Sequence, residues 1–179
     1  MIFGCFFCSL WAAFGCGSLD QPYFLEYFNL FIISVLNILY KGHVENLPEM
    51  SQGRSSHGCG AYYNGGTLVI IVANGWDRID GGVSSTEKLH IGATAWITVS
   101  PLPSSHAGLH GVASVSMENK IYLSGGYSVG SESNGVRNEI FEYDEDEEGW
   151  KEVGQLQSWA FHHAMTAIKM DNKVIEYCI

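Results

Sequence analysis

The stretch KIYLSGG, Lys120 to Gly126, has the hydrophobic pattern of a short, largely buried strand that ends in glycine. Ile121 and Leu123 flank Tyr122, which favours β-structure, and two residues without a Cβ atom follow shortly after. Paired glycines let the backbone turn sharply or pack closely against a neighbour. Because glycine turns are common, the pattern is informative only if it recurs, and TLVIIVANG, which ends at Gly75, repeats it.

The same order of sequence segments recurs along the chain. Three similar segments begin with histidine and are spaced 53 residues apart: HGCGA at His57, HGVAS at His110 and HAMTA at His163. We call these segments anchors. Between the anchors Trp96 corresponds to Trp150, and Glu87 corresponds to Glu139. HVENLPEM, before the first anchor, is a degenerate copy of the segment that follows each tryptophan. The sequence therefore contains a repeat of about fifty residues.

Each unit holds four pieces with strand character. A strand of small residues follows the histidine, and a hydrophobic strand ends at the glycines. A third strand is expected around Glu87–Leu89 or Ile140–Tyr143, and a fourth starts at the tryptophan. Periods near fifty with four strands are typical of β-propeller blades, so we expect an all-β chain.

At Gly125 and Gly126, then Tyr143, then Trp150, the sequence resembles the Kelch repeat family. The resemblance covers residues 44–168 and implies a partial Kelch-type β-propeller of four-stranded antiparallel blades, with about two full blades and two partial ones. Such propellers usually close with several more blades. The resemblance leaves three explanations open: a fragment, an incompletely read gene, or a propeller that is completed by a second copy of the chain.

The first copy departs from the family pattern. Asn74 replaces the first glycine, and Leu89 or His90 stands where the tyrosine is expected. The arginine that often opens the inner strand is present as Arg54, whereas we expect Ala107 in its place in the second copy and an alanine again in the third. These changes weaken the match of that blade and leave the architecture unchanged.

The composition changes sharply near Lys41, so we divide the chain into residues 1–41, an apolar signal-like or membrane-anchor segment, and residues 42–179, the Kelch repeat region. Met1–Leu19 carries no charged side chain and ends in small residues, as signal peptides do, but it lacks a basic start. The apolar run Tyr23–Tyr40 is interrupted by Glu26 and two asparagines. A secretory signal or anchor, a membrane span and an atypical N-terminus all stay open. We expect the secretory pathway or a membrane, with the cytoplasm as the alternative.

Charge excludes one class of partner. A formal net charge of -10 without a basic cluster is unsuited to binding nucleic acid. The acidic run Asp144–Glu148 is expected to be a solvated hairpin tip, since it lacks the spacing of a calcium loop. The five cysteines do not form a zinc motif, and the three spaced histidines favour packing over a metal site because no carboxylates accompany them. No cofactor or metal is predicted.

Loops are the best candidates for function. In a four-stranded antiparallel blade, the connection after the second strand and the one after the fourth emerge on the same face. Aromatic and arginine side chains are enriched in binding hot spots, although a plain solvated loop is the alternative. The predicted partner-binding residues on these connections are Trp76, Asp77, Arg78, Tyr127, Arg137 and Trp159. The predicted structural positions of the repeat are Gly75, Glu87, Trp96, Gly125, Gly126, Glu139, Tyr143 and Trp150.

The chain carries no recognisable set of catalytic residues. The sialidase-type box, the copper ligands of galactose oxidase, the GxSxG elbow and a phosphate-binding glycine loop are all missing. We therefore predict a protein-interaction module and no enzyme, with an unidentified protein partner and self-association that completes the propeller. The alternative is a secreted or membrane-tethered propeller enzyme acting on carbohydrate, resembling galactose oxidase or a sialidase.

Overall fold

The computed structural model of the chain describes residues 23–24, 37–40, 43–128 and 135–167, and side chains from residue 47 onward. Within these residues no helix is long and apolar enough to cross a membrane. The predicted signal-like stretch Met1–Leu19 lies outside the described residues, so the expectation of secretion stays a prediction.

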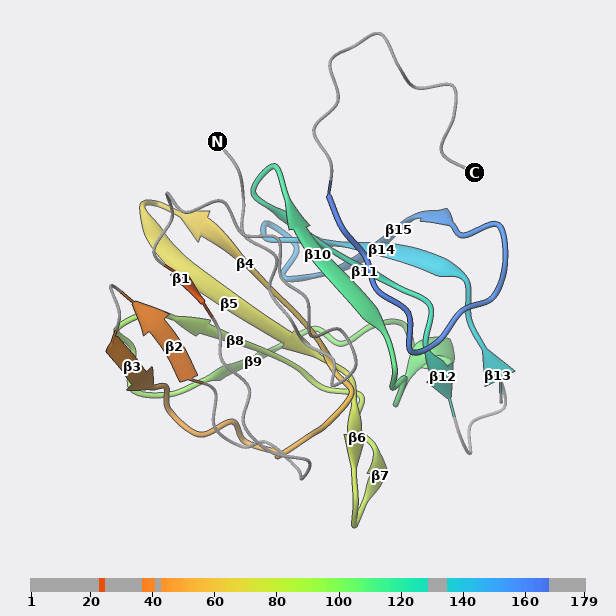
Figure 1. Ribbon diagram of the computed structural model, residues 1–179, viewed down its shortest axis with the longest axis horizontal. Helices are drawn as coiled ribbons and strands as arrows, with labels where there is room; N and C mark the ends of the chain where they lie inside the picture. The colour runs from red at the N-terminus through yellow and green to blue at the C-terminus, as the bar shows by residue number, and fades with distance from the viewer. Residues whose placement is uncertain (1–22, 25–36, 41–42, 129–134, 168–179) are drawn as a thin grey trace, which may run out of the picture.

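Two four-stranded antiparallel sheets form the body of the molecule (Figure 1). Blade 1 consists of β4 (Gly58–Asn64), β5 (Thr67–Ala73), β8 (Thr86–His90) and β9 (Ile97–Val99), paired in that order. Blade 2 consists of β10 (Ala113–Met117), β11 (Lys120–Ser124), β14 (Glu139–Asp144) and β15 (Gly149–Gln155). The four strands predicted for each unit are confirmed, and so is the all-β propeller-type fold.

A smaller sheet precedes blade 1. It pairs β1 (Tyr23–Phe24), β2 (Asn37–Tyr40) and β3 (His43–Asn46) antiparallel in chain order. β2 and β3 pair from Asn37 with Asn46 to Tyr40 with His43, so the predicted boundary at Lys41 falls between two paired strands. β3 is the fourth strand of a partial unit, which agrees with the degenerate copy at His43.

The connection from the second to the third strand of each blade folds into a small two-stranded ribbon. β6 (Trp76–Asp77) pairs with β7 (Gly81–Gly82), and β12 (Tyr127–Ser128) pairs with β13 (Gly135–Val136). Both ribbons extend from the same end of the blades (Figure 1). We call this end the ribbon face, and the end that carries the tight turns within each blade the hairpin end.

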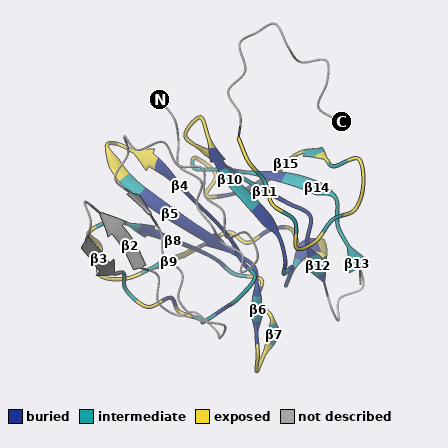
Figure 2. Ribbon diagram, in the orientation of Figure 1, coloured by how far each residue is buried: buried dark blue, intermediate teal, exposed yellow. Residues whose placement is uncertain are grey.

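The core lies between the two sheets (Figure 2). Val69 and Ile71 of blade 1 pack against Ile121 and Tyr143 of blade 2, all of them buried. Trp150 covers this cluster and donates a hydrogen bond from Nε1 to Thr86 Oγ1 at 3.0 Å. Trp96 likewise reaches back to the preceding segment, where Nε1 donates to the Pro48 carbonyl at 2.8 Å. Each repeat tryptophan therefore packs toward the unit that comes before it.

The structure corrects the alignment of the repeat at its second histidine. Ser55 pairs with Trp76, and His110 pairs with Tyr127, so His110 is equivalent to Ser55. Val112, the equivalent of His57, contacts Gly126 in the way that His57 contacts Gly75. The even spacing of 53 residues is misleading here because the first hairpin is longer than the second: β4 and β5 have seven residues each, whereas β10 and β11 have five each.

The glycines after the second strands carry the contact between successive units. The Gly75 amide donates to the Leu109 carbonyl at 2.7 Å, and the Gly126 amide donates to the Ala160 carbonyl at 2.8 Å. Gly126 has a φ of 105°, and a Cβ atom there would lie 2.6 Å from Val112 Cγ1. Both the backbone conformation and the space at this position therefore favour glycine.

A buried ion pair joins the segment before β4 to the third strand of blade 1, β8. Arg54 is fully buried and pairs with Glu87, and it also donates to the Ser85 carbonyl at 2.7 Å. In blade 2 His106, at the end of the short 3-10 helix η1 (Ser104–His106), lies 3.3 Å from Glu139. We expected Ala107 in the place of the arginine, but by the corrected alignment Leu109 stands there, and the Glu139 carboxylate lies beside His106 instead.

We predict that Gly126→Val destabilises the protein by roughly 1 to 3 kcal/mol, because it combines an unfavourable φ with a steric clash. Gly66→Val is the matched control, since Gly66 also has a positive φ but a Cβ atom added there would meet nothing within 4 Å. Urea unfolding would compare the two free energies. Equal losses would show that crowding at Gly126 contributes nothing.

Arg54→Met should destabilise by about 3 to 5 kcal/mol, because it leaves the buried Glu87 carboxylate without its counter-charge. The double variant Arg54→Met, Glu87→Met removes both charges and should recover a large part of that loss. A double-mutant cycle from urea unfolding measures the coupling. Simple additivity of the two single effects would contradict a coupled pair.

His57 should make stability depend on pH. Burial, followed by the charge of Arg54, lowers the pKa of His57 to about 4. Between pH 6.5 and 4 the unfolded chain therefore binds a proton at His57 that the folded chain does not bind. The free energy of unfolding falls as the pH falls through that window. The loss should approach about 3 kcal/mol, and His57→Leu should abolish it. Parallel stability curves for wild type and variant from about pH 7 to pH 4 would refute the assignment.

Candidate interaction face

Four connections converge on the ribbon face. The β6–β7 and β12–β13 ribbons follow the second strands, and the residues after β9 and β15 lead to the next unit on the same side (Figure 1). The Gly126 and Ala160 backbones bond to each other, as do Ala160 and Arg137, so the segment after β15 lies against the second ribbon. The face predicted from strand connectivity therefore forms a continuous surface.

A row of rings crosses this face. Trp76 lies 5.0 Å from His110, His110 lies 5.5 Å from Tyr127, and Tyr127 lies 6.0 Å from Phe161, measured between ring centroids. The rings come alternately from a ribbon and from the segment that leads into the next unit. We call Trp76, His110, Tyr127 and Phe161 the aromatic row. The row thus brings together two of the predicted residues, Trp76 and Tyr127, through a histidine between them.

The position of the row follows from the repeat. His110 and Phe161 each follow the residue whose carbonyl accepts the glycine amide of the unit before, Leu109 and Ala160, and each pairs with or contacts the ribbon of that unit. Burial lowers the pKa of His110, so its imidazole is mainly neutral at pH 7 and packs as an aromatic ring. Trp76, His110 and Tyr127 are half-buried, and Phe161 is exposed.

The predicted polar residues differ from one another in their surroundings. Asp77 is buried, and its Oδ1 accepts the Ile79 amide at 2.7 Å and the Asp80 amide at 3.3 Å, so this carboxylate stabilises the ribbon turn. Arg78 is exposed beside it. Arg137 is half-buried and donates from Nη2 to the Ser105 carbonyl at 3.1 Å, which ties the second ribbon to the connection after β9.

Exposed hydrophobic side chains border the aromatic row. Ile79, at the tip of the first ribbon, is 88% exposed, and Trp159, in the segment after β15, is 74% exposed. They are the two most exposed large hydrophobic side chains among the described residues. Trp159 was among the predicted residues, whereas Ile79, His110 and Phe161 were not. The offsets that align His110 with its counterparts in the other units become visible only once the hairpin lengths are known.

The acidic run Asp144–Glu148 at the hairpin end is not simply a solvated tip, as the sequence suggested. It forms the turn between β14 and β15, but Glu145 and Glu148 both pair with Lys88 of blade 1, which is buried. Glu145 also accepts hydrogen bonds from Tyr62 and Asn64. The run therefore contributes to the contact between blades.

Metal-ligating side chains do not gather in the part of the chain that the structure describes: no group of three or more His, Cys, Asp or Glu is placed to hold an ion. The three anchor histidines lie in different surroundings. His57 is buried in blade 1, His110 belongs to the aromatic row, and His163 lies with Nε2 2.9 Å from Ser124 Oγ.

Comparison with known proteins agrees with the architecture. A model of the Kelch motif matches residues 108–157, which span blade 2. The solved structure of YjhT, a Kelch-type propeller, aligns with a TM-score of 0.55 and 14% sequence identity, over 69% of this chain and 46% of YjhT. The chain thus spans less than half the length of YjhT, and the likeness concerns the fold alone. No curated protein sequence matches the chain.

The motif match, the structural likeness and the two four-stranded blades with their glycine and tryptophan positions agree with one another. Residues 108–157 match a Kelch motif, and the chain has a partial Kelch-type β-propeller fold.

Proposed function

We propose that this chain is a protein-interaction module that binds a partner through the ribbon face. The observation that carries the proposal is the exposure of Ile79 and Trp159 on either side of the aromatic row. Large hydrophobic side chains that are this exposed gain free energy when a partner removes them from water.

The residue types on this face suit a protein partner. Trp and Tyr are enriched among residues that dominate binding energy, because they bury a large area at a small cost in conformational entropy. The rings of the aromatic row support one another by tilted and edge-to-face contacts, so little side-chain freedom is left to lose on binding. The arginines Arg78 and Arg137 add charge at the edge of the row.

Removing the exposed rings should weaken binding without unfolding the protein. We expect Trp159→Ala with Phe161→Ala to weaken partner binding by at least about 2 kcal/mol, roughly thirtyfold, if these rings are hot spots. Pull-down with mass spectrometry identifies partners of the wild type, and titration of an identified partner measures the loss.

The matched control is Ile97→Ala with Val153→Ala, which removes two exposed hydrophobic side chains from the outer strands β9 and β15. This control should keep the wild-type partners. Circular dichroism and light scattering verify that both variants keep the fold and the oligomeric state of the wild type. A folded Trp159→Ala, Phe161→Ala variant that retained every partner at full affinity would rule out this part of the face as the binding surface.

A further inference from the structure

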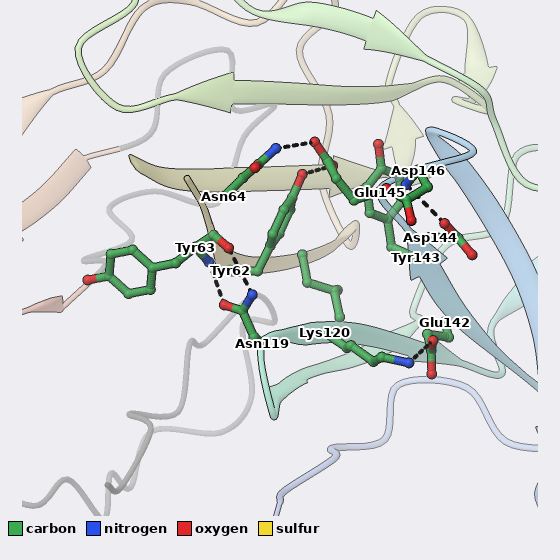
Figure 3. Close-up of a pocket in the computed structure, with 11 residues that line it drawn as sticks. Tyr62, Tyr63, Asn64, Asn119, Lys120, Glu142, Tyr143, Asp144, Glu145 and Asp146 are labelled. Atoms are coloured by element: carbon green, nitrogen blue, oxygen red, sulfur yellow. Dashed lines mark hydrogen bonds and ion pairs between the residues drawn. The ribbon is translucent and has the colours of Figure 1, made fainter. Parts of the chain in front are cut away.

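A cavity of about 370 Å³ opens at the hairpin end, between the two blades (Figure 3). One wall is the end of β4, Tyr62–Asn64, and the opposite wall is the start of the turn after β14. Asn119 closes a third side by pairing with the Tyr63 backbone, at 2.6 Å from its Oδ1 to the amide nitrogen and 2.8 Å from its Nδ2 to the carbonyl. The cavity is thus framed by residues that are fixed by backbone contacts.

The charge of the lining is strongly negative. Four carboxylates and one ammonium group line the cavity, Glu142, Asp144, Glu145, Asp146 and Lys120, for a formal charge of -3. Lys120 is already paired with Glu142, and Glu145 accepts hydrogen bonds from Tyr62 and Asn64. Figure 3 shows these pairs along the wall of the cavity.

Two carboxylates keep acceptor capacity for a ligand. Asp144 uses Oδ1 to accept the amides of Asp146 and Glu147 at 3.0 and 3.2 Å. Its Oδ2 and the Asp146 carboxylate accept no hydrogen bond from another described residue. The turn therefore holds Asp144 in place while it leaves oxygen atoms available for a donor.

A buried hydroxyl group supplies an independent observation. Tyr143 is only 4% exposed, it lines the cavity, and its hydroxyl group has no hydrogen-bond partner among the described residues. Burial and then the charges of Glu145, Glu148 and Asp144 raise the pKa of Tyr143, so the phenol stays protonated. A buried polar group without a partner is costly, and a ligand that hydrogen-bonds to it would remove that cost.

We propose that this cavity binds the guanidinium group of an arginine side chain from a partner protein. Carboxylate oxygens and an unpaired phenol oxygen match a planar cation with several donors. The proposed site lies at the opposite end of the blades from the ribbon face and does not rest on the function proposed for that face.

Size and donor number favour arginine over the other cations. A bare metal ion needs several oxygens converging at short range, whereas this cavity has the volume of a side chain. Lysine carries a compact point charge, whereas the planar guanidinium fork can donate to two neighbouring acceptors, such as Asp144 and Asp146, at the same time.

The test is an NMR titration of the full chain with the peptide acetyl-Gly-Arg-Gly-amide, following the backbone amides of Asn119 and Asp146. We expect saturable shifts for this peptide and at least fivefold weaker binding for the same peptide with citrulline, which has the shape of arginine without its charge, or with lysine. Equal binding of the citrulline or lysine peptide, no saturable shift, or displacement of the peptide by stoichiometric Ca²⁺ would overturn the proposal.

Variants locate the binding to this cavity. Asp146→Asn should weaken the arginine peptide about tenfold, whereas Glu147→Gln, which removes the same charge from the same turn outside the cavity lining, should change it less than twofold. Tyr143→Phe should also weaken binding, by about tenfold, while the melting temperature stays the same or rises because the lost hydroxyl group had no partner. Equal effects of Asp146→Asn and Glu147→Gln would show only a general charge effect and would refute the site.

Discussion

The close approach of backbones at Gly75 and Gly126 is the constraint on which the rest of the structure depends. From each glycine an amide reaches a carbonyl of the next unit, at 2.7 and 2.8 Å, and a side chain at either position would collide with its surroundings. These bonds set the spacing and angle between successive blades. The packing of Trp150 on blade 1 and the alignment of rings on the ribbon face both follow from that one geometry.

The close approach of the two blades also supplies hydrogen-bond partners to the inner strands. β4 is an edge strand, so its outward amides would lack partners in an isolated sheet. Here Ser114 Oγ accepts the Cys59 amide at 3.0 Å, and Ser116 Oγ accepts the Ala61 amide at 2.9 Å. Small hydroxyl side chains fit where the strands are near each other, which explains why the inner strands are rich in Gly, Ser and Ala rather than in large hydrophobic residues.

The sequence was sufficient for features that depend on local pattern and insufficient for those that depend on contacts between units. Strand order, the turn glycines and the shared face of Trp76 and Tyr127 follow from periodicity and connectivity. The equivalence of His110 with Ser55 does not, because it requires the lengths of two hairpins, which differ. Likewise, nothing in the run Asp144–Glu148 indicates that Lys88, far earlier in the chain, is buried beneath it. The burial of Asp77 was also hidden, since a turn-stabilising carboxylate and an exposed one look alike in sequence.

The unequal lengths of the two hairpins have a consequence for how repeat proteins acquire polar binding sites. Because β4 has seven residues and β10 has five, the end of β4 overhangs its neighbour by about 7 Å of strand, and the overhanging Asn64 reaches the turn of blade 2. Units of identical length would leave no overhang. An insertion or deletion of two residues keeps every side chain on its original face of the sheet. Unequal duplication can therefore open or close a polar cavity at a blade junction while both blades keep their cores.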